Sequence, residues 1–189
     1  MFPAHNPEIL YFGCFDARLP MAEVGIPMGQ VMIPRDPAAF VYPDSAHHLD
    51  QGSALEAAIK GRKVKHIVVT GHTDCNAIGA LVDKRRDWPR TAAYLAPLEP
   101  KRAQFEAQGV DKETQKRRLE QEAVRVSLRN LRSYDLVREG EQKGELELHG
   151  WILDVRTNAL LVLDEKRDVF VSCAEVVHRP DAKQRRGAE

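Results

Sequence analysis

Two short stretches of the chain hold side chains that bind metal ions. The stretch FGCFDARLP places Cys14, Asp16 and Arg18 at alternate positions, so the three side chains point the same way if the backbone is extended. The stretch GHTDC places His72 and Cys75 three residues apart. Sulfur and nitrogen ligands suit zinc, which takes four protein ligands or three and a water molecule. The residue types therefore predict a zinc site of Cys14, His72 and Cys75, with Asp16 or water in the fourth position.

Both stretches follow segments that have the pattern of buried strands. Residues 8–13, 30–33 and 66–70 are short apolar runs, and the last is rich in the β-branched residues that strands favour. Cys14 and His72 therefore fall at the carboxyl ends of two strands. A His-x-x-Cys pair alone is more often a buried cysteine near an incidental histidine, but two clusters at equivalent strand ends favour metal ligation.

Helices are predicted on both sides of the third strand. A crossover helix is expected over 53–61, where Ser53 and Glu56 form a capping box. Strand, helix and strand joined by short loops favour a right-handed parallel unit, in which ligands gather at the carboxyl ends of the strands. Residues 98–131 carry apolar side chains at helical spacing and predict an amphipathic helix that covers one sheet face.

The residue pattern near the C-terminus predicts a strand hairpin followed by a tail. Residues 145–155 and 159–164 are apolar runs joined by turn residues at 157–158. The polar residues 181–189 are expected to be disordered. The whole chain, 1–189, is long enough for one domain with a core that needs no disulfide bonds.

Composition points to a small-molecule or protein partner. The 28 Lys and Arg residues are balanced by 28 Asp and Glu, so the charge indicates neither nucleic acid nor an anionic membrane surface as a partner. No apolar run has transmembrane length, and the first residues lack the pattern of a signal peptide, so we expect a cytoplasmic protein. Three cysteines in a reducing compartment favour metal ligation or burial, and burial is expected for Cys173.

The two motifs resemble the signature of the β-class carbonic anhydrases, Cys-x-Asp-x-Arg after the first strand and His-x-x-Cys after a later one. The likeness runs from about Asn6 to Asp164 and includes SALEAAIKGRKVKHIVVTGHTDC and NLRSYDLVREGEQKGELELHGWILDVRTNALLVLD. The resemblance implies an α/β fold, with a mostly parallel sheet flanked by helices and a C-terminal strand hairpin. It also implies the reversible hydration of carbon dioxide to bicarbonate by zinc-bound hydroxide.

The resemblance gives Asp16 and Arg18 catalytic roles. Two thiolate ligands acidify a zinc-bound water less than three imidazoles do, so a nearby acceptor such as Asp16 becomes useful. Arg18 can hold Asp16 off the metal by a bidentate ion pair. Members of the family occur in two forms. In the closed form the aspartate binds the metal, and in the open form it does not. The sequence does not decide between the two forms. Because pocket walls in the family come partly from a neighbour, a homodimer or higher homo-oligomer is expected.

The chain departs from the family pattern at three places, and His5, Arg35 and Asn76 at these places are candidates for substrate binding. His5 replaces the common glutamine nine residues before the first cysteine, where the family has a neutral hydrogen-bond donor. Arg35 begins RDPAA, where the family has Arg-Asn-Ala-Gly-Asn. Asn76 stands where a glycine usually follows the second cysteine.

Two other functions stay open from the sequence. A hydrolase for carbonyl sulfide or carbon disulfide is the first, because related folds with the same zinc ligands catalyse that reaction and the 35–39 loop is altered. The second is a non-catalytic oligomer that keeps zinc for folding and acts as a binding module. A purely structural site has no need of Asp16 and Arg18 beside its ligands, which favours an enzyme.

Overall fold

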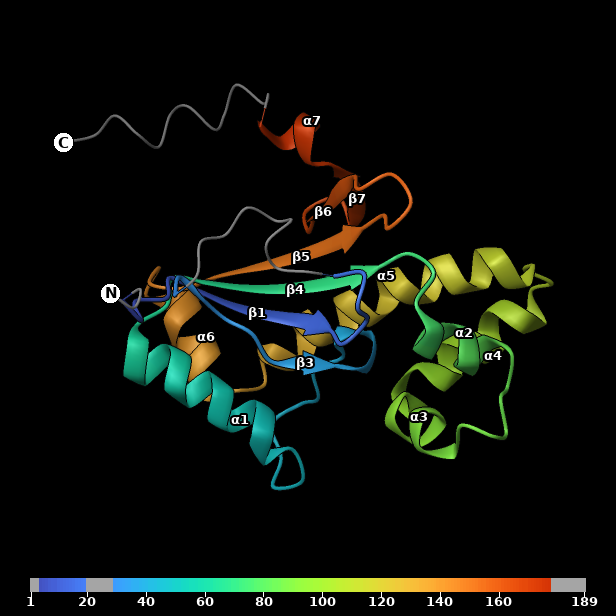
Figure 1. Ribbon diagram of the computed structural model, residues 1–189, viewed down its shortest axis with the longest axis horizontal. Helices are drawn as coiled ribbons and strands as arrows, with labels where there is room; N and C mark the ends of the chain where they lie inside the picture. The colour runs from blue at the N-terminus through green and yellow to red at the C-terminus, as the bar shows by residue number, and fades with distance from the viewer. Residues whose placement is uncertain (1–3, 20–28, 178–189) are drawn as a thin grey trace.

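The computed structural model describes residues 4–19 and 29–177, and these residues build a seven-stranded sheet (Figure 1). The strand order is β2-β1-β4-β5-β6-β7, and β3 also pairs with β1. Strands β1 to β5 pair in parallel, whereas β6 and β7 are antiparallel. The predicted α/β class, with its mostly parallel sheet and C-terminal hairpin, is confirmed. The strands are β1 (Ile9–Cys14), β2 (Val31–Met32), β3 (Arg35–Asp36), β4 (His66–His72), β5 (Glu147–Leu153), β6 (Leu160–Asp164) and β7 (Val169–Ser172).

The predicted strand at 30–33 is shorter than expected, and a second short strand, β3, follows it after Pro34. Pro34 has no N–H to donate to the sheet, so pairing stops after β2 and resumes at β3. The carbonyl oxygen of Pro34 still accepts a hydrogen bond from the backbone N–H of Gly13 at 3.2 Å. The interruption therefore leaves the chain beside β1.

The crossover helix begins earlier than its predicted capping box. Helix α1 (Leu49–Glu56) continues into a stretch of π-helix, η3 (Ala57–Arg62), and Ser53 lies inside α1. The extra turn buries Gln51, whose side chain accepts a hydrogen bond from the N–H of Tyr42 at 2.8 Å and donates one to the carbonyl of Phe40 at 3.0 Å. These tertiary contacts outweigh the local capping signal, so the predicted capping box is wrong.

The single helix predicted over 98–131 is two helices. Gly109 has a φ of +70°, which L side chains rarely adopt, and Asp111 caps the second helix by accepting a hydrogen bond from the N–H of Thr114 at 2.9 Å. The helices and turns not yet given are η2 (Pro37–Ala39), α2 (Asn76–Val82), α3 (Pro89–Tyr94), η4 (Ala96–Leu98), α4 (Glu99–Ala107), α5 (Lys112–Leu131), α6 (Asp135–Gln142) and α7 (Cys173–Val177).

Two apolar cores hold these elements together. In Figure 1, α2, α3 and α4 gather beyond the tips of β1 and β4, and α1 and α6 lie together along the sheet. The first core joins the sheet to α1, α5 and α6. The second joins α2, α4 and α5 at the carboxyl ends of the strands and contains Cys14 and Cys75. The predicted metal ligands thus lie at a junction between layers.

The last described segment differs in part from expectation. Strand β7 was not predicted, and Cys173 begins α7 as a half-buried residue, so the expected full burial is wrong. The predicted disordered tail, 181–189, lies outside the described residues. None of the described helices has the length and apolar character that crossing a membrane requires.

Candidate metal centre

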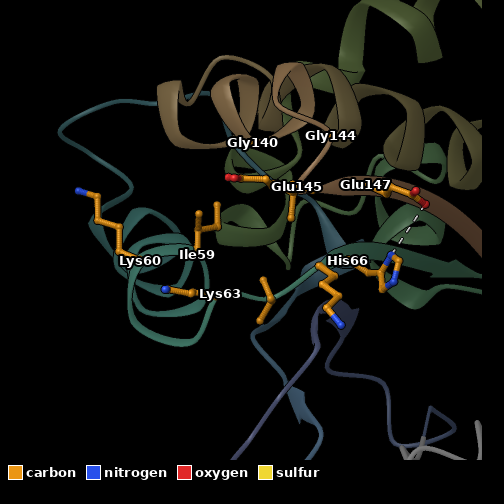
Figure 2. Close-up of a pocket in the computed structure, with 11 residues that line it drawn as sticks. Ile59, Lys60, Lys63, His66, Gly140, Gly144, Glu145 and Glu147 are labelled. Atoms are coloured by element: carbon orange, nitrogen blue, oxygen red, sulfur yellow. Dashed lines mark ion pairs between the residues drawn. The ribbon is translucent and has the colours of Figure 1, made fainter. Parts of the chain in front are cut away.

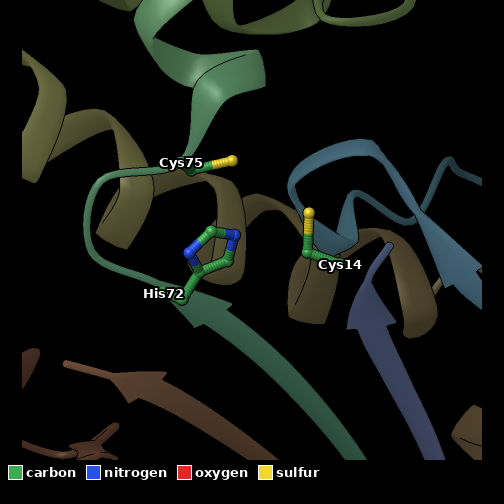
Figure 3. Close-up of side chains that lie close together, drawn as sticks. All are labelled: Cys14, His72 and Cys75. Carbon is green, nitrogen blue, oxygen red and sulfur yellow. The ribbon is translucent and has the colours of Figure 1, made fainter. Parts of the chain in front are cut away.

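Cys14, His72 and Cys75 converge at the carboxyl ends of two adjacent strands. Cys14 ends β1, His72 ends β4, and Cys75 immediately precedes α2. Their ligand atoms all lie within 4.8 Å of one another, and all three residues are buried. Figure 3 shows the imidazole of His72 and the two sulfur atoms around one common space. The parallel pairing of β1 with β4 therefore brings together the three side chains that the sequence predicts.

The imidazole of His72 leaves one nitrogen available to a ligand. Nδ1 lies 2.9 Å from the carbonyl oxygen of Thr73, which can only accept, so Nδ1 carries the proton. Nε2 is buried and has no hydrogen-bond partner among residues 4–19 and 29–177. A buried acceptor without a partner costs about 1–3 kcal/mol, and a metal ion would remove that cost.

The two thiols are arranged to share negative charge. The pKa of Cys14 is lowered to about 4, chiefly because Cys75 donates a hydrogen bond to its thiolate. The same hydrogen bond raises the pKa of Cys75. Burial would lower the pKa of His72, but the neighbouring Cys14 sulfur raises it. Without a cation the pair favours one thiolate, and a divalent ion would allow two, so this donor set fits zinc.

Asp16 is held beside this group by a two-pronged ion pair. Arg18 donates to Asp16 from Nη2 at 2.7 Å and from Nε at 2.9 Å. These hydrogen bonds lower the pKa of Asp16 to about 2, so it is a carboxylate at neutral pH. Asp16 Oδ2 lies 3.9 Å from His72 Nε2. Both carboxylate oxygens of Asp16 are thus held by Arg18.

Three further charged residues support the centre, and none of them is predicted from the sequence. Arg18 Nη2 also donates to the carbonyl oxygen of Asp74 at 2.9 Å, and the carboxylate of Asp74 pairs with Arg156 at 2.8 Å. Glu120 of α5 accepts a hydrogen bond from the N–H of Cys75 at 3.0 Å. Burial raises the pKa of Glu120 to about 7. The signal available in the sequence was the position of Glu120 next to the apolar stripe of α5.

A cavity of about 380 Å³ opens beside the centre. Asn76, a predicted substrate-binding residue, lies on its wall, and so does Trp88. The lining residues are Cys14, Phe15, Asp16, Ala17, Arg18, Cys75, Asn76, Ala77, Trp88 and Thr91. The wall thus combines two charged side chains with apolar ones.

The other two predicted substrate-binding residues do not reach this cavity within one chain. His5 precedes β1, so it lies at the opposite end of that strand from Cys14, and its carbonyl accepts a hydrogen bond from Arg62 at 3.4 Å. The guanidinium of Arg35 donates to the carbonyl oxygens of Cys14 at 3.3 Å and Leu19 at 2.7 Å. Arg35 therefore holds the loop that carries Asp16.

Comparison with known proteins matches this fold and this group of residues. The carbonic anhydrase family model matches residues 9–160. A mitochondrial β carbonic anhydrase 6 of Arabidopsis thaliana is 27% identical over 154 residues, which are 78% of this chain. The chain spans 53% of the length of that relative.

Solved structures match most of this chain. A β-carbonic anhydrase of the fungal pathogen Aspergillus fumigatus is 31% identical with a TM-score of 0.76, covering 85% of this chain and 76% of that one. For tetrameric β-carbonic anhydrases of the ascomycete Sordaria macrospora, the identity is 27% and the TM-score 0.77, over 85% of this chain and 82% of that one. The chain therefore belongs to the β-carbonic anhydrase family.

Proposed function

We propose that this protein catalyses the reversible hydration of carbon dioxide to bicarbonate, with zinc held by Cys14, His72 and Cys75. One observation carries the proposal: a buried sulfur, nitrogen and sulfur set, with an unpartnered His72 Nε2, adjoins the Asp16–Arg18 ion pair. Zinc, when bound, would supply a Lewis acid that makes water acidic enough to be a nucleophile near neutral pH.

Asp16 acts as the acceptor that orients the reacting water. Its pKa of about 2 keeps it ionised, and Oδ2 is 3.9 Å from His72 Nε2, so it lies beside the ligand set. A hydrogen bond donated by the water to Oδ2 turns a lone pair of the water oxygen towards the cavity. Arg18 holds both carboxylate oxygens, which keeps Asp16 from binding the metal.

The cavity provides a place for a small apolar substrate. Ala17 and Ala77 give it short apolar wall residues, and Phe15 and Trp88 give it aromatic ones. Carbon dioxide has no hydrogen to donate, so an apolar wall admits it without leaving buried donors unpaired. Asn76, at the start of α2, offers an amide to the more polar product.

Carbon dioxide hydration by stopped-flow across pH, on protein with measured zinc content, tests the proposal. We expect Asp16→Asn to lower kcat by about 100-fold or more while zinc content stays the same, since it removes a charged acceptor. Arg18→Ala should also lower activity. Arg138→Ala, which breaks the exposed ion pair with Asp135, is the matched control and should leave activity unchanged.

Two outcomes would favour the other functions. Release of sulfide from carbonyl sulfide or carbon disulfide, with slow carbon dioxide hydration, would identify a sulfur-compound hydrolase. The exposed Phe15, on a mostly apolar wall, is compatible with such substrates. Stoichiometric zinc without either activity, and no effect of Asp16→Asn, would identify a non-catalytic zinc-stabilised module.

We further propose that the working form is a homo-oligomer. The Sordaria macrospora relatives are tetrameric. His5, which does not reach the cavity of its own chain, is then available to a neighbouring subunit. Light scattering on the purified protein tests this proposal, and a monomer at full activity would contradict it.

A further inference from the structure

A second group of metal-binding side chains lies at the amino-terminal ends of the central strands. His66 begins β4, and β5 carries Glu147 and His149. The parallel register places His66 opposite Glu147, and His149 lies two residues further along β5. Because alternate residues of a strand share a face, all three side chains project from the same face of the sheet. This group lies at the opposite end of β4 from His72.

The three side chains converge through one atom each. His66 Nδ1 lies 3.2 Å from His149 Nε2, and Glu147 Oε2 lies 3.9 Å from the first nitrogen and 3.8 Å from the second. In a tetrahedral zinc site with Zn–N bonds of about 2.0–2.1 Å, two nitrogens are separated by roughly 3.3 Å. The two imidazoles are thus already spaced as metal ligands.

The carboxylate can complete the group by a small movement. The Glu147 side chain is 63% exposed, so it is free to approach the imidazoles by the roughly 0.5 Å that a tetrahedral site requires. A hydrogen bond between the two histidines explains only the distance between their nitrogens. It does not explain why a carboxylate oxygen faces the same two nitrogens.

The surroundings leave this group open to an ion from solvent. His66 and Glu147 lie on the rim of a cavity of about 850 Å³, where Figure 2 shows their side chains facing each other. Lys60, Lys63 and Lys65 line the same cavity, and Glu145 adds a carboxylate to its wall. Lys60 pairs with Glu56 at 3.2 Å and Lys65 with Glu8 at 3.1 Å, which reduces the repulsion that these two lysines would exert on a cation.

We propose that His66, Glu147 and His149 form a second divalent metal site, separate from the cysteine-containing centre. Two imidazoles and one carboxylate suit zinc, cobalt or nickel, and leave a position for water. A metal there links β4 directly to β5. Occupancy therefore stabilises the sheet without a change at the cavity beside Asp16.

Cobalt titration of protein that already holds one equivalent of zinc tests this site. Cobalt bound to thiolates absorbs strongly through sulfur charge transfer, whereas cobalt bound by nitrogen and oxygen shows only weak d–d bands. We expect one further cobalt ion per chain with the weak bands alone. Uptake that comes with sulfur charge transfer would instead report on Cys14 and Cys75, so failure here is separable from failure of the proposed function.

Three variants locate the second ion. His149→Ala removes a ligand, and Glu147→Gln keeps the shape while removing the charge. Both variants should lower the affinity for the second ion by more than the roughly 10–100-fold that loss of an outer-shell partner causes. His47→Ala, an exposed histidine near α1, is the matched control. No uptake by the wild type, or equal affinity in all variants, would overturn the proposal.

Discussion

Asp36 is a half-buried carboxyl group close to the metal centre. It lies opposite Cys14 in the register of β3 and β1, and Gln51 Nε2 donates a hydrogen bond to its Oδ2 at 3.2 Å. Burial raises the pKa of Asp36, and the nearby Asp50 adds to this effect. The protonated form is therefore favoured in the folded protein more than in the unfolded chain.

The sign of the pH effect follows from this shift. A carboxyl group with a raised folded pKa contributes stability that is full below the unfolded pKa of about 3.9 and is lost as the pH rises through the folded pKa. Asp36→Asn removes the charge and still accepts the hydrogen bond from Gln51. We expect this variant to unfold at higher urea concentration than the wild type at pH 7, and the difference to shrink towards pH 3.

Two results would contradict this prediction for Asp36. One is a variant less stable than the wild type at pH 7, and the other is a difference that is constant across pH. Asp44→Asn serves as the control, because it makes the same change at an exposed position in the loop that follows Tyr42.

The residues that sequence could and could not predict differ in how they reach the centre. Cys14 and His72 were predictable because each ends a strand, and Cys75 because it follows His72 by three residues. Glu120 and Arg156 approach from α5 and from the turn after β5, so their contacts depend on how distant segments pack. The altered loop that begins at Arg35 likewise does not reveal that Arg35 binds backbone carbonyls.

At the scale of elements, α5 packs so closely on the sheet that a Cβ atom at Gly71 would force a neighbouring side chain to shift. A Cβ atom at Gly71 would lie 2.9 Å from Ile152 Cδ1 and 2.9 Å from Val124 Cγ2. Gly71 immediately precedes His72 in β4, so any shift there also moves a predicted ligand. The spacing between helix and sheet is thus linked to the geometry of the centre.

We expect Gly71→Ala to destabilise the fold by about 1–3 kcal/mol, because overpacking a buried contact forces neighbours to move. Urea unfolding measures the change, and zinc affinity should fall with it. Gly61→Ala is the matched control, since nothing lies within 4 Å of its Cβ position, and it should be neutral or stabilise η3 by up to about 1 kcal/mol. Equal effects of the two substitutions would show that close packing is not the cause.

The parallel unit and the hairpin were predictable, but β7 and the boundaries of the elements were not. Apolar runs bounded by prolines and turn residues gave the parallel strands and the hairpin of β5 and β6. The start of α1 is set by the buried hydrogen bonds of Gln51, and the break before α5 by Gly109 and the cap at Asp111. Local sequence signals and tertiary contacts both influence where a helix begins, and the sequence does not reveal which of them prevails.

At the scale of the whole molecule, the metal centre joins parts of the chain that are distant in sequence. Its three side chains come from β1, β4 and the start of α2, and Glu120 adds α5 through its hydrogen bond to Cys75. A metal bound only by the folded state adds its binding free energy to stability. Zinc removal should therefore lower the free energy of unfolding of the whole molecule.

Thermal unfolding with and without zinc measures how much this centre contributes to stability. Metal binding at the second proposed site must first be removed by substitution. In a His149→Ala background, zinc at 100 times its Kd should stabilise the fold by about 2.7 kcal/mol. Adding Cys75→Ala should abolish that gain, because a buried ligand is lost and Cys14 and His72 alone cannot close the site. A gain of the same size in both proteins would mean that zinc acts somewhere other than this centre.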